Sequence, residues 1–218
     1  MAGEGRWGGE PDILRYDQST MTAPRRSPTA VTAARDATGR NRVRIIGGKW
    51  RSRVVQFPAA AALRPTPDRV RETLFNWLGQ RLDGLSCLDL FAGSGALGFE
   101  AASRGARRVV LVERERETAR NLRESATALQ AVEVEVVAAD AIEYLARARE
   151  VFDVVFLDPP YASDLAAAAL AKLPKHLTPG ARVYVESPKP LEGPGGWTVL
   201  REARAGAVRY ALLQVTTP

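Results

Sequence analysis

Short apolar runs alternate with helix-forming segments along most of this 218-residue chain. The segments between the runs are rich in Ala, Leu, Arg and Glu, and this rhythm is typical of a parallel sheet covered by helices on both faces. The strands expected from the runs are 85–91, 109–113, 134–138, 152–157 and 182–186. Two further runs, 197–202 and 208–215, flank a turn at Ala205-Gly206 and predict an antiparallel pair. The expected fold class is therefore α/β, with a seven-stranded, mostly parallel sheet.

The chain has one cysteine, Cys87, and one histidine, His176. A disulfide needs two cysteines and zinc sites need several Cys or His ligands, so we expect neither, and no metal. A Ser-His-Asp hydrolase is disfavoured because no nucleophile motif lies near His176. We expect Cys87 to be a small core residue and His176 to be an exposed residue at a helix end. No apolar run has membrane-spanning length, so the expected compartment is the cytoplasm.

Positive charge is concentrated ahead of the alternating region. The net charge is +6, and residues 25–53 hold nine basic side chains and one acidic one. A basic block of this kind indicates a polyanionic partner, most often nucleic acid, or a solvated tail without a partner. We predict three parts: a disordered basic tail (1–42), a β-hairpin extension (43–62) and the main domain (63–218).

Two short runs around Gly47-Gly48 predict the hairpin. Alternate residues of an extended strand over 49–57 share a face, so Trp50 would point away from the cations and pack on the domain. A lone hairpin is marginal in water, which is a second reason to expect this packing. The cations that could follow a phosphate backbone are Arg44, Lys49, Arg51 and Arg53. Further along, Thr66-Pro67-Asp68 predicts a helix start with Thr66 as the N-cap.

A glycine pattern follows the first strand of the alternating region. Its spacing, Gly93-x-Gly95-x-x-Gly98, lets the backbone approach a ligand closely at the start of a helix. Glu113 ends the next strand, twenty positions after Gly93, where an acid can accept both ribose hydroxyls of an adenosine. Asp89 places a carboxylate beneath the loop, either for a cation or for local backbone N–H groups. The pattern alone leaves a nicotinamide dinucleotide and S-adenosylmethionine (SAM) open.

The tetrapeptide Asp158-Pro159-Pro160-Tyr161 follows the buried run 152–157. Ligands of open α/β sheets bind at the carboxyl ends of the strands, so Asp158 would face the glycine loop if the first and fourth strands are neighbours. Two prolines remove two N–H donors, and the loop then presents acceptors: the Asp158 carboxylate and the Pro159 carbonyl. Such acceptors suit an exocyclic amine, and Tyr161 offers a surface for base stacking. The pair of motifs favours SAM and methyl transfer to a base.

The loop 158–161, together with residues 89–95, resembles class I SAM-dependent methyltransferases that act on exocyclic amines of nucleic-acid bases. The strings at 44–51 and 64–77 are similar to the bacterial RsmD-type family, which modifies guanine N2 in 16S rRNA. The resemblance covers residues 43–217. It implies a Rossmann-like fold, SAM as the cofactor, and a monomer whose partner is 16S rRNA or the small-subunit ribosomal particle, with the basic hairpin as an RNA-binding extension.

The resemblance also implies roles for particular residues. Asp140 would bond the adenine amino group, although it fits equally well as the N-cap of a helix at 141–147. Arg64 and Thr66 would close over the cofactor or substrate, and residues 187–189 would line the base pocket or form a surface turn. Catalysis would fall to Asp158, Pro159, Pro160 and Tyr161. SAM would contact Asp89, Phe91, Gly93, Gly95, Glu113, Asp140 and Ala141.

Three other functions remain to be weighed against rRNA guanine-N2 methylation. The amine-methylating loop is shared with N6-adenine DNA methyltransferases. An rRNA-binding assembly factor that no longer methylates is a second alternative, which the intact loop at 158–161 disfavours. An NAD oxidoreductase is a third, and the chain offers no histidine placed to handle a hydride.

Overall fold

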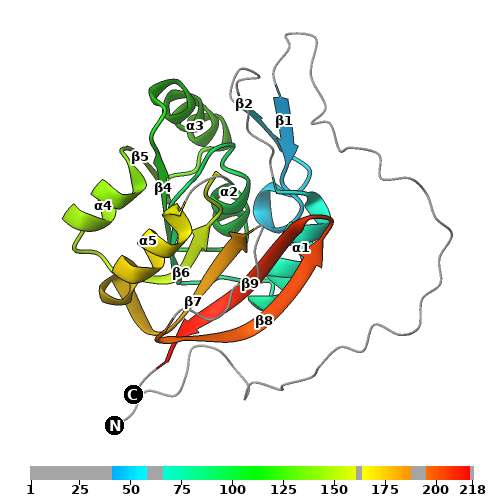
Figure 1. Ribbon diagram of the computed structural model, residues 1–218. Helices are drawn as coiled ribbons and strands as arrows, with labels where there is room; N and C mark the ends of the chain where they lie inside the picture. Colours follow the sequence, from blue (N-terminus) through cyan, green and yellow to red (C-terminus); the bar gives the residue numbers. More distant parts are fainter. Residues whose placement is uncertain (1–40, 58–65, 161–163, 188–194, 217–218) are drawn as a thin grey trace, which may run out of the picture.

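The computed structural model describes residues 41–57, 66–160, 164–187 and 195–216. A seven-stranded sheet runs through the main domain in the order β5-β4-β3-β6-β7-β9-β8 (Figure 1). Its first five strands in that order are parallel, and β9 is antiparallel to both β7 and β8. The strands are β3 (Ser86–Asp89), β4 (Arg108–Glu113), β5 (Val134–Ala138), β6 (Phe152–Leu157), β7 (Leu177–Ser187), β8 (Trp197–Ala205) and β9 (Val208–Val215).

The sheet confirms the fold class expected from the sequence. Strands β5, β6 and β9 have the expected bounds. Burial explains why apolar runs located them: every residue of β3 and β6, at the centre, is buried, whereas β5 lies at an edge and is only partly buried. Strand β7 begins five residues earlier than expected, because Leu177 pairs with Phe152 before a register shift leads into the main ladder.

Helices cover both faces of the sheet (Figure 1). One buried apolar cluster contains α1, α2, α3 and the N-terminal strands, and a second contains α4 and α5. All eight residues of α2 are buried, so this helix has no solvent face. The helices are α1 (Asp68–Trp77), α2 (Ala96–Ser103), α3 (Arg116–Leu129), α4 (Ala141–Arg147) and α5 (Leu165–Lys172). Among the described residues, no helix combines the length and the apolar character needed to cross a membrane.

The N-terminal extension differs from the expected hairpin. Its antiparallel strands are β1 (Asn41–Arg44) and β2 (Val54–Phe57), so β1 begins two residues before the expected boundary. The link is not a tight turn at Gly47-Gly48 but a longer connection containing the short 3-10 helix Gly48–Trp50. The cause is the buried Trp50 ring and the backbone N–H of Trp50, which donates to Ser103 Oγ at 2.9 Å.

Two single residues give opposite outcomes. Cys87 is buried in β3, as expected, and burial raises the pKa of its thiol. The expectation for His176 was wrong, because the ring is 1% exposed. Its Nε2 lies 2.8 Å from the carbonyl oxygen of Leu145 and its Nδ1 lies 3.1 Å from that of Glu150. The imidazole therefore ties the end of α4 to the segment that leads into β6.

Candidate active site

A cavity of about 560 Å³ opens at the carboxyl ends of the central strands. Strands β3 and β6 are neighbours, with Asp89 opposite Phe156, so Asp158 faces the glycine loop as expected. Six of the seven residues predicted to bind the cofactor line this cavity: Asp89, Phe91, Gly93, Glu113, Asp140 and Ala141. Thr66, Asp158, Pro159 and Pro160 line it too. The volume lies within the range of small-molecule sites, roughly 300–1,000 Å³.

The glycine loop turns directly from β3 into α2. Gly95 precedes the helix with φ +76°, a left-handed conformation that favours glycine, and it shapes the loop without lining the cavity. A Cβ atom on Gly98 would lie 2.1 Å from the Leu111 side chain and 3.3 Å from an Asp89 oxygen. The third glycine is therefore needed for close packing of the helix against the strand ends.

Asp89 is a buried carboxylate at the end of β3. Its Oδ2 accepts a hydrogen bond from the Gly98 N–H at 3.0 Å. Burial raises the pKa of Asp89 to about 7, and the nearby Glu113 carboxylate raises it further, while the N–H bond from Gly98 opposes the shift. Both roles weighed from the sequence are thus compatible: the side chain bonds local backbone and also borders the cavity.

Two other acids border the cavity through bonds to backbone N–H groups. Glu113, at the end of β4, accepts from the N–H groups of Gly93 at 2.9 Å and Glu115 at 2.7 Å. Asp140 is the N-cap of α4, and its Oδ1 accepts from the next N–H groups along the helix, at 2.8 and 3.2 Å. The N-cap role of Asp140 is confirmed, and its contact with an adenine remains a prediction.

Asp158 follows β6 and receives a hydrogen bond from the Thr66 hydroxyl, with 3.2 Å between Oγ1 and Oδ2. Thr66 was expected to cap α1, which was wrong: the helix begins at Asp68 after Pro67, and the Thr66 side chain points into the site instead. Withdrawal from solvent raises the pKa of Asp158 well above its ordinary value, and the neighbouring carboxylates of Glu186 and Asp89 add to this.

Known proteins share this arrangement. A family described as Conserved hypothetical protein 95 has a model that matches residues 43–214. The ribosomal RNA small subunit methyltransferase D of Haemophilus influenzae is 43% identical over 180 residues, which make up 79% of this chain and 93% of that protein. The chain belongs to this family. The resemblance to the RsmD family is thereby confirmed.

Solved structures extend the comparison. The yhhF protein of Escherichia coli superposes with a TM-score of 0.75 at 41% identity, over 82% of this chain and all of that one. The Thermus thermophilus 16S rRNA N2 G1207 methyltransferase RsmC was solved in complex with AdoMet and guanosine. It is 26% identical with a TM-score of 0.60, over 80% of this chain and 49% of RsmC.

Sequence reasoning missed Glu186 in this RsmD-family site. The register of β6 and β7 pairs Leu157 with Val185, so Asp158 and Glu186 follow side by side at the strand ends. Glu186 is buried, and its Oε1 accepts from the Tyr184 hydroxyl at 2.8 Å. The available signal was an acid at the end of an apolar run beside the catalytic loop, since such strand ends meet at one edge of the sheet.

The predicted RNA-binding cations of this RsmD-family chain do not share one strand face. Lys49 lies in the short 3-10 helix, ion-paired with Glu133 and 4.4 Å from the centroid of the Trp50 ring. Arg51 and Arg53 are exposed beyond it, and Arg53 borders a separate cavity of about 400 Å³ between β2 and α3. Arg44 instead pairs with Asp68 at 3.2 Å. Arg64, Tyr161 and Lys189 lie outside the described residues.

Proposed function

We propose that the protein methylates the exocyclic N2 amine of a guanine in 16S rRNA of the small ribosomal subunit. As a member of the RsmD family, it is a methyltransferase acting on ribosomal RNA, and its cofactor is S-adenosyl-L-methionine. The guanine base and the N2 position are the finer part of the proposal. The observation that carries it is that Asp158-Pro159-Pro160 opens onto the same cavity as the glycine loop.

The residues at the cavity fit this cofactor. The buried Asp89 carboxylate, with its raised pKa, is suited to an adjacent cation, which would favour its ionised form. Glu113 would accept the ribose hydroxyls, Asp140 would accept the adenine amino group, and Phe91 and Ala141 would form apolar walls. Bound there, SAM supplies an electrophilic methyl group carried on a sulfonium.

The catalytic loop would act on the acceptor amine through hydrogen-bond acceptors. The lone pair of an aromatic amine is delocalised into the ring, which makes the nitrogen a poor nucleophile. Hydrogen bonds from the amine to the Asp158 carboxylate and the Pro159 carbonyl favour the pyramidal nitrogen of the transition state. The nitrogen must also lose one proton, and a carboxylate with a raised pKa is suited to accept it.

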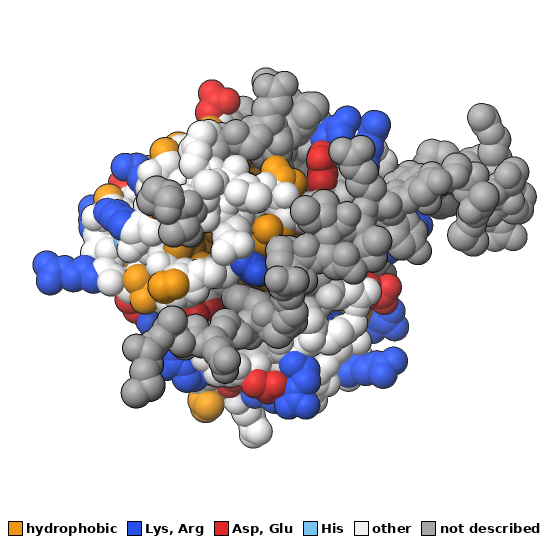
Figure 2. Space-filling view, turned by 90° about the horizontal axis from the view of Figure 1, so that it is seen from below, with side chains coloured by type: hydrophobic (Ala, Val, Ile, Leu, Met, Phe, Trp, Pro, Cys, Tyr) orange, Lys and Arg blue, Asp and Glu red, His pale blue; other side chains and the backbone are white. Residues whose placement is uncertain are grey.

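The RNA must present an unstacked base to reach Asp158. Tyr161 would stack on that base, and Arg64 and Thr66 would close the site around it. Arg44, Lys49, Arg51 and Arg53 of the extension would contact phosphates. Figure 2 shows that, on the face seen from below in Figure 1, the Lys and Arg side chains of the described residues are scattered among acidic ones. This distribution favours the extension as the source of electrostatic attraction.

The test offers the purified protein labelled SAM with 16S rRNA, with assembled small subunits and with DNA, followed by nucleoside mass spectrometry. We expect N2-methylguanosine from one of the ribosomal substrates. N6-methyladenine in the DNA would favour the DNA methyltransferase alternative, and no transfer to any substrate would favour the assembly factor. Asp158→Ala should abolish transfer and leave the Kd for SAM within a few-fold, because the carboxylate faces the amine.

A further inference from the structure

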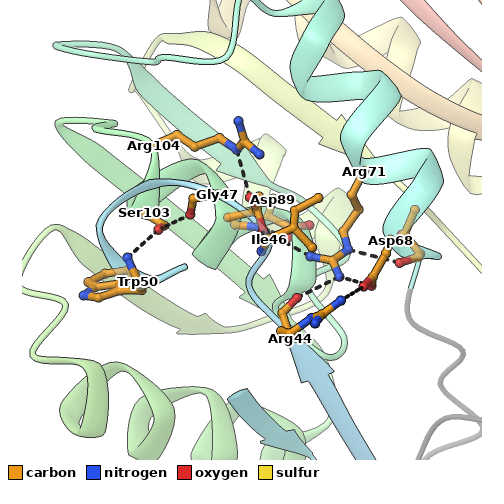
Figure 3. A network of polar contacts seen from close by, with 12 residues as sticks. Arg44, Ile46, Gly47, Trp50, Asp68, Arg71, Asp89, Ser103 and Arg104 are labelled. Atoms are coloured by element: carbon orange, nitrogen blue, oxygen red, sulfur yellow. Dashed lines mark hydrogen bonds and ion pairs between the residues drawn. The ribbon is translucent and has the colours of Figure 1, made fainter. Parts of the chain in front are cut away.

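A buried charged network lies behind the catalytic loop. The side chains of Arg71 in α1 and Glu100 in α2 are both fully buried and are joined by a 3.1 Å ion pair. Figure 3 shows the Arg71 guanidinium at the meeting point of several segments. Its Nη2 donates to the Arg44 carbonyl at 2.8 Å and to Asp68 Oδ1 at 2.6 Å, and its Nε donates to the Thr66 carbonyl at 3.2 Å.

Glu100 connects the same network to the N-terminal extension. One of its oxygens accepts from the Ile46 N–H at 2.8 Å as well as from Arg71. The other accepts from Arg104 at 2.8 Å. The end of β1, the residue before α1 and the middle of α2 are therefore held together by one guanidinium and one carboxylate.

Stability alone is a weak reason for such a network. Taking two charges out of water is costly, and replacing a buried ion pair with well-packed apolar side chains is often neutral or stabilising. What the guanidinium provides is geometry, because its rigid planar fork bonds several acceptors in fixed directions at once. A lysine at position 71 would have one nitrogen and could not serve Thr66, Glu100 and Arg44 together.

We propose that Arg71 is a positioning residue for methyl transfer, acting through Thr66 on Asp158. Arg71 holds the carbonyl of Thr66, and the Thr66 hydroxyl donates to Asp158 Oδ2 at 3.2 Å. The bond orients the carboxylate and favours its ionised form, in which it can accept hydrogen bonds from the amine. The inference rests on the proposed catalytic role of Asp158.

The groups that face Asp158 define the expected pH effect. The carboxylates of Asp89, from β3, and Glu186, from β7, raise its pKa together with burial, and the hydroxyl of Thr66 lowers it. Tyr184 stands beside Glu186 with its own hydroxyl engaged. Losing the Thr66 hydroxyl therefore raises the pKa of Asp158. The acid limb of the kcat/KM profile should then move to higher pH.

The test compares Thr66→Val, Thr66→Ser and Arg71→Lys over a pH series. Thr66→Val should lower kcat/KM about three- to tenfold on the acid limb and little at high pH, and Thr66→Ser should restore the parent profile. Arg71→Lys should move the limb in the same direction as Thr66→Val. It should add no further shift in the Thr66→Val background, because both changes remove the same interaction.

Controls separate positioning from folding. Arg69→Lys, on the exposed side of the same helix, should leave the profile unchanged. A merely structural defect lowers the rate equally at every pH and leaves the limb in place. If Arg71→Lys does not fold, Arg71→Met combined with Glu100→Gln removes both buried charges and takes its place.

The outcomes distinguish this inference from the proposed function. An unmoved limb in Thr66→Val, or in the folded Arg71 variants, would overturn the positioning role while Asp158→Ala remains inactive. Full activity in Asp158→Ala would instead overturn the proposed catalytic residue.

Discussion

The backbone N–H of Gly98 donates to Oδ2 of Asp89 across 3.0 Å, and this bond joins the third glycine of the loop to the end of β3. The carboxylate is otherwise deeply buried, and its pKa lies at about 7. In the free protein near neutral pH, Asp89 is therefore divided between its neutral and ionised forms. Two predictions depend on that balance.

The first concerns cofactor affinity. A cationic ligand beside Asp89 favours the ionised carboxylate, so binding below pH 7 must release a proton. We expect the affinity for SAM to rise as the pH rises from 5.5 toward about 7 and to level off above it. Calorimetry in two buffers of different ionisation enthalpy measures the released proton. In Asp89→Asn, the affinity should be weaker and the proton release should disappear; release that persists in this variant would assign it to another group.

The second concerns stability. The pKa of Asp89 is raised from 3.8 to about 7 in the folded state, so folding favours the neutral form. The stabilising contribution is present in full below pH 4 and is lost as the pH rises through about 7. A difference of about three pH units corresponds to ~4 kcal/mol. Asp89→Asn keeps an acceptor for Gly98, and its gain in unfolding free energy over the parent should be larger at pH 8 than at pH 5. Equal gains at both values would contradict the prediction.

The third concerns Glu186. Its negative charge raises the pKa of Asp158, so Glu186→Gln should lower that pKa. The acid limb of kcat/KM should move to lower pH, opposite to the effect of Thr66→Val. Tyr184→Phe is the matched control, because it removes a hydroxyl from Glu186 without removing the charge. A limb that moves upward in Glu186→Gln would show that Glu186 supports Asp158 in another way.

The fourth concerns the cations of the extension. Lys49 already pairs with Glu133, whereas Arg51 and Arg53 are exposed. Replacing Arg51 and Arg53 with Ala should flatten the salt dependence of RNA binding by about 1.4, at ~0.7 per lost phosphate contact to single-stranded RNA. Lys49→Ala should flatten it by less than ~0.7. Filter binding over a salt series measures both slopes, and SAM affinity should not change. A larger effect from Lys49→Ala would show that RNA displaces Glu133.

The fold could be predicted because its information is local. Apolar runs such as 152–157 correspond to central strands that are buried on both faces, and the positions of Asp89, Glu113 and Asp158 follow from strand ends. The cavity could be placed for the same reason, since the carboxyl ends of parallel strands share one edge. The catalytic assignments made at these positions remain predictions.

The missed features depend on partners far along the chain. Trp50 is drawn inward by Ser103, and His176 is enclosed by carbonyls of Leu145 and Glu150. Arg71 lies in a stretch of charged residues that is typical of a solvated helix face, and only Glu100, on another helix, explains its burial. A strand pattern or a helix period contains no information about such contacts.

The anchors of the N-terminal strands also set an order of assembly during synthesis. A two-stranded sheet such as β1–β2 is marginal by itself, and the groups that hold it, Arg71, Glu100 and Ser103, are all translated after it. The extension therefore has to wait for α2 to leave the ribosome before it can settle. The segment made first becomes ordered late, and the surface proposed to hold RNA exists only once the core of the main domain has begun to form.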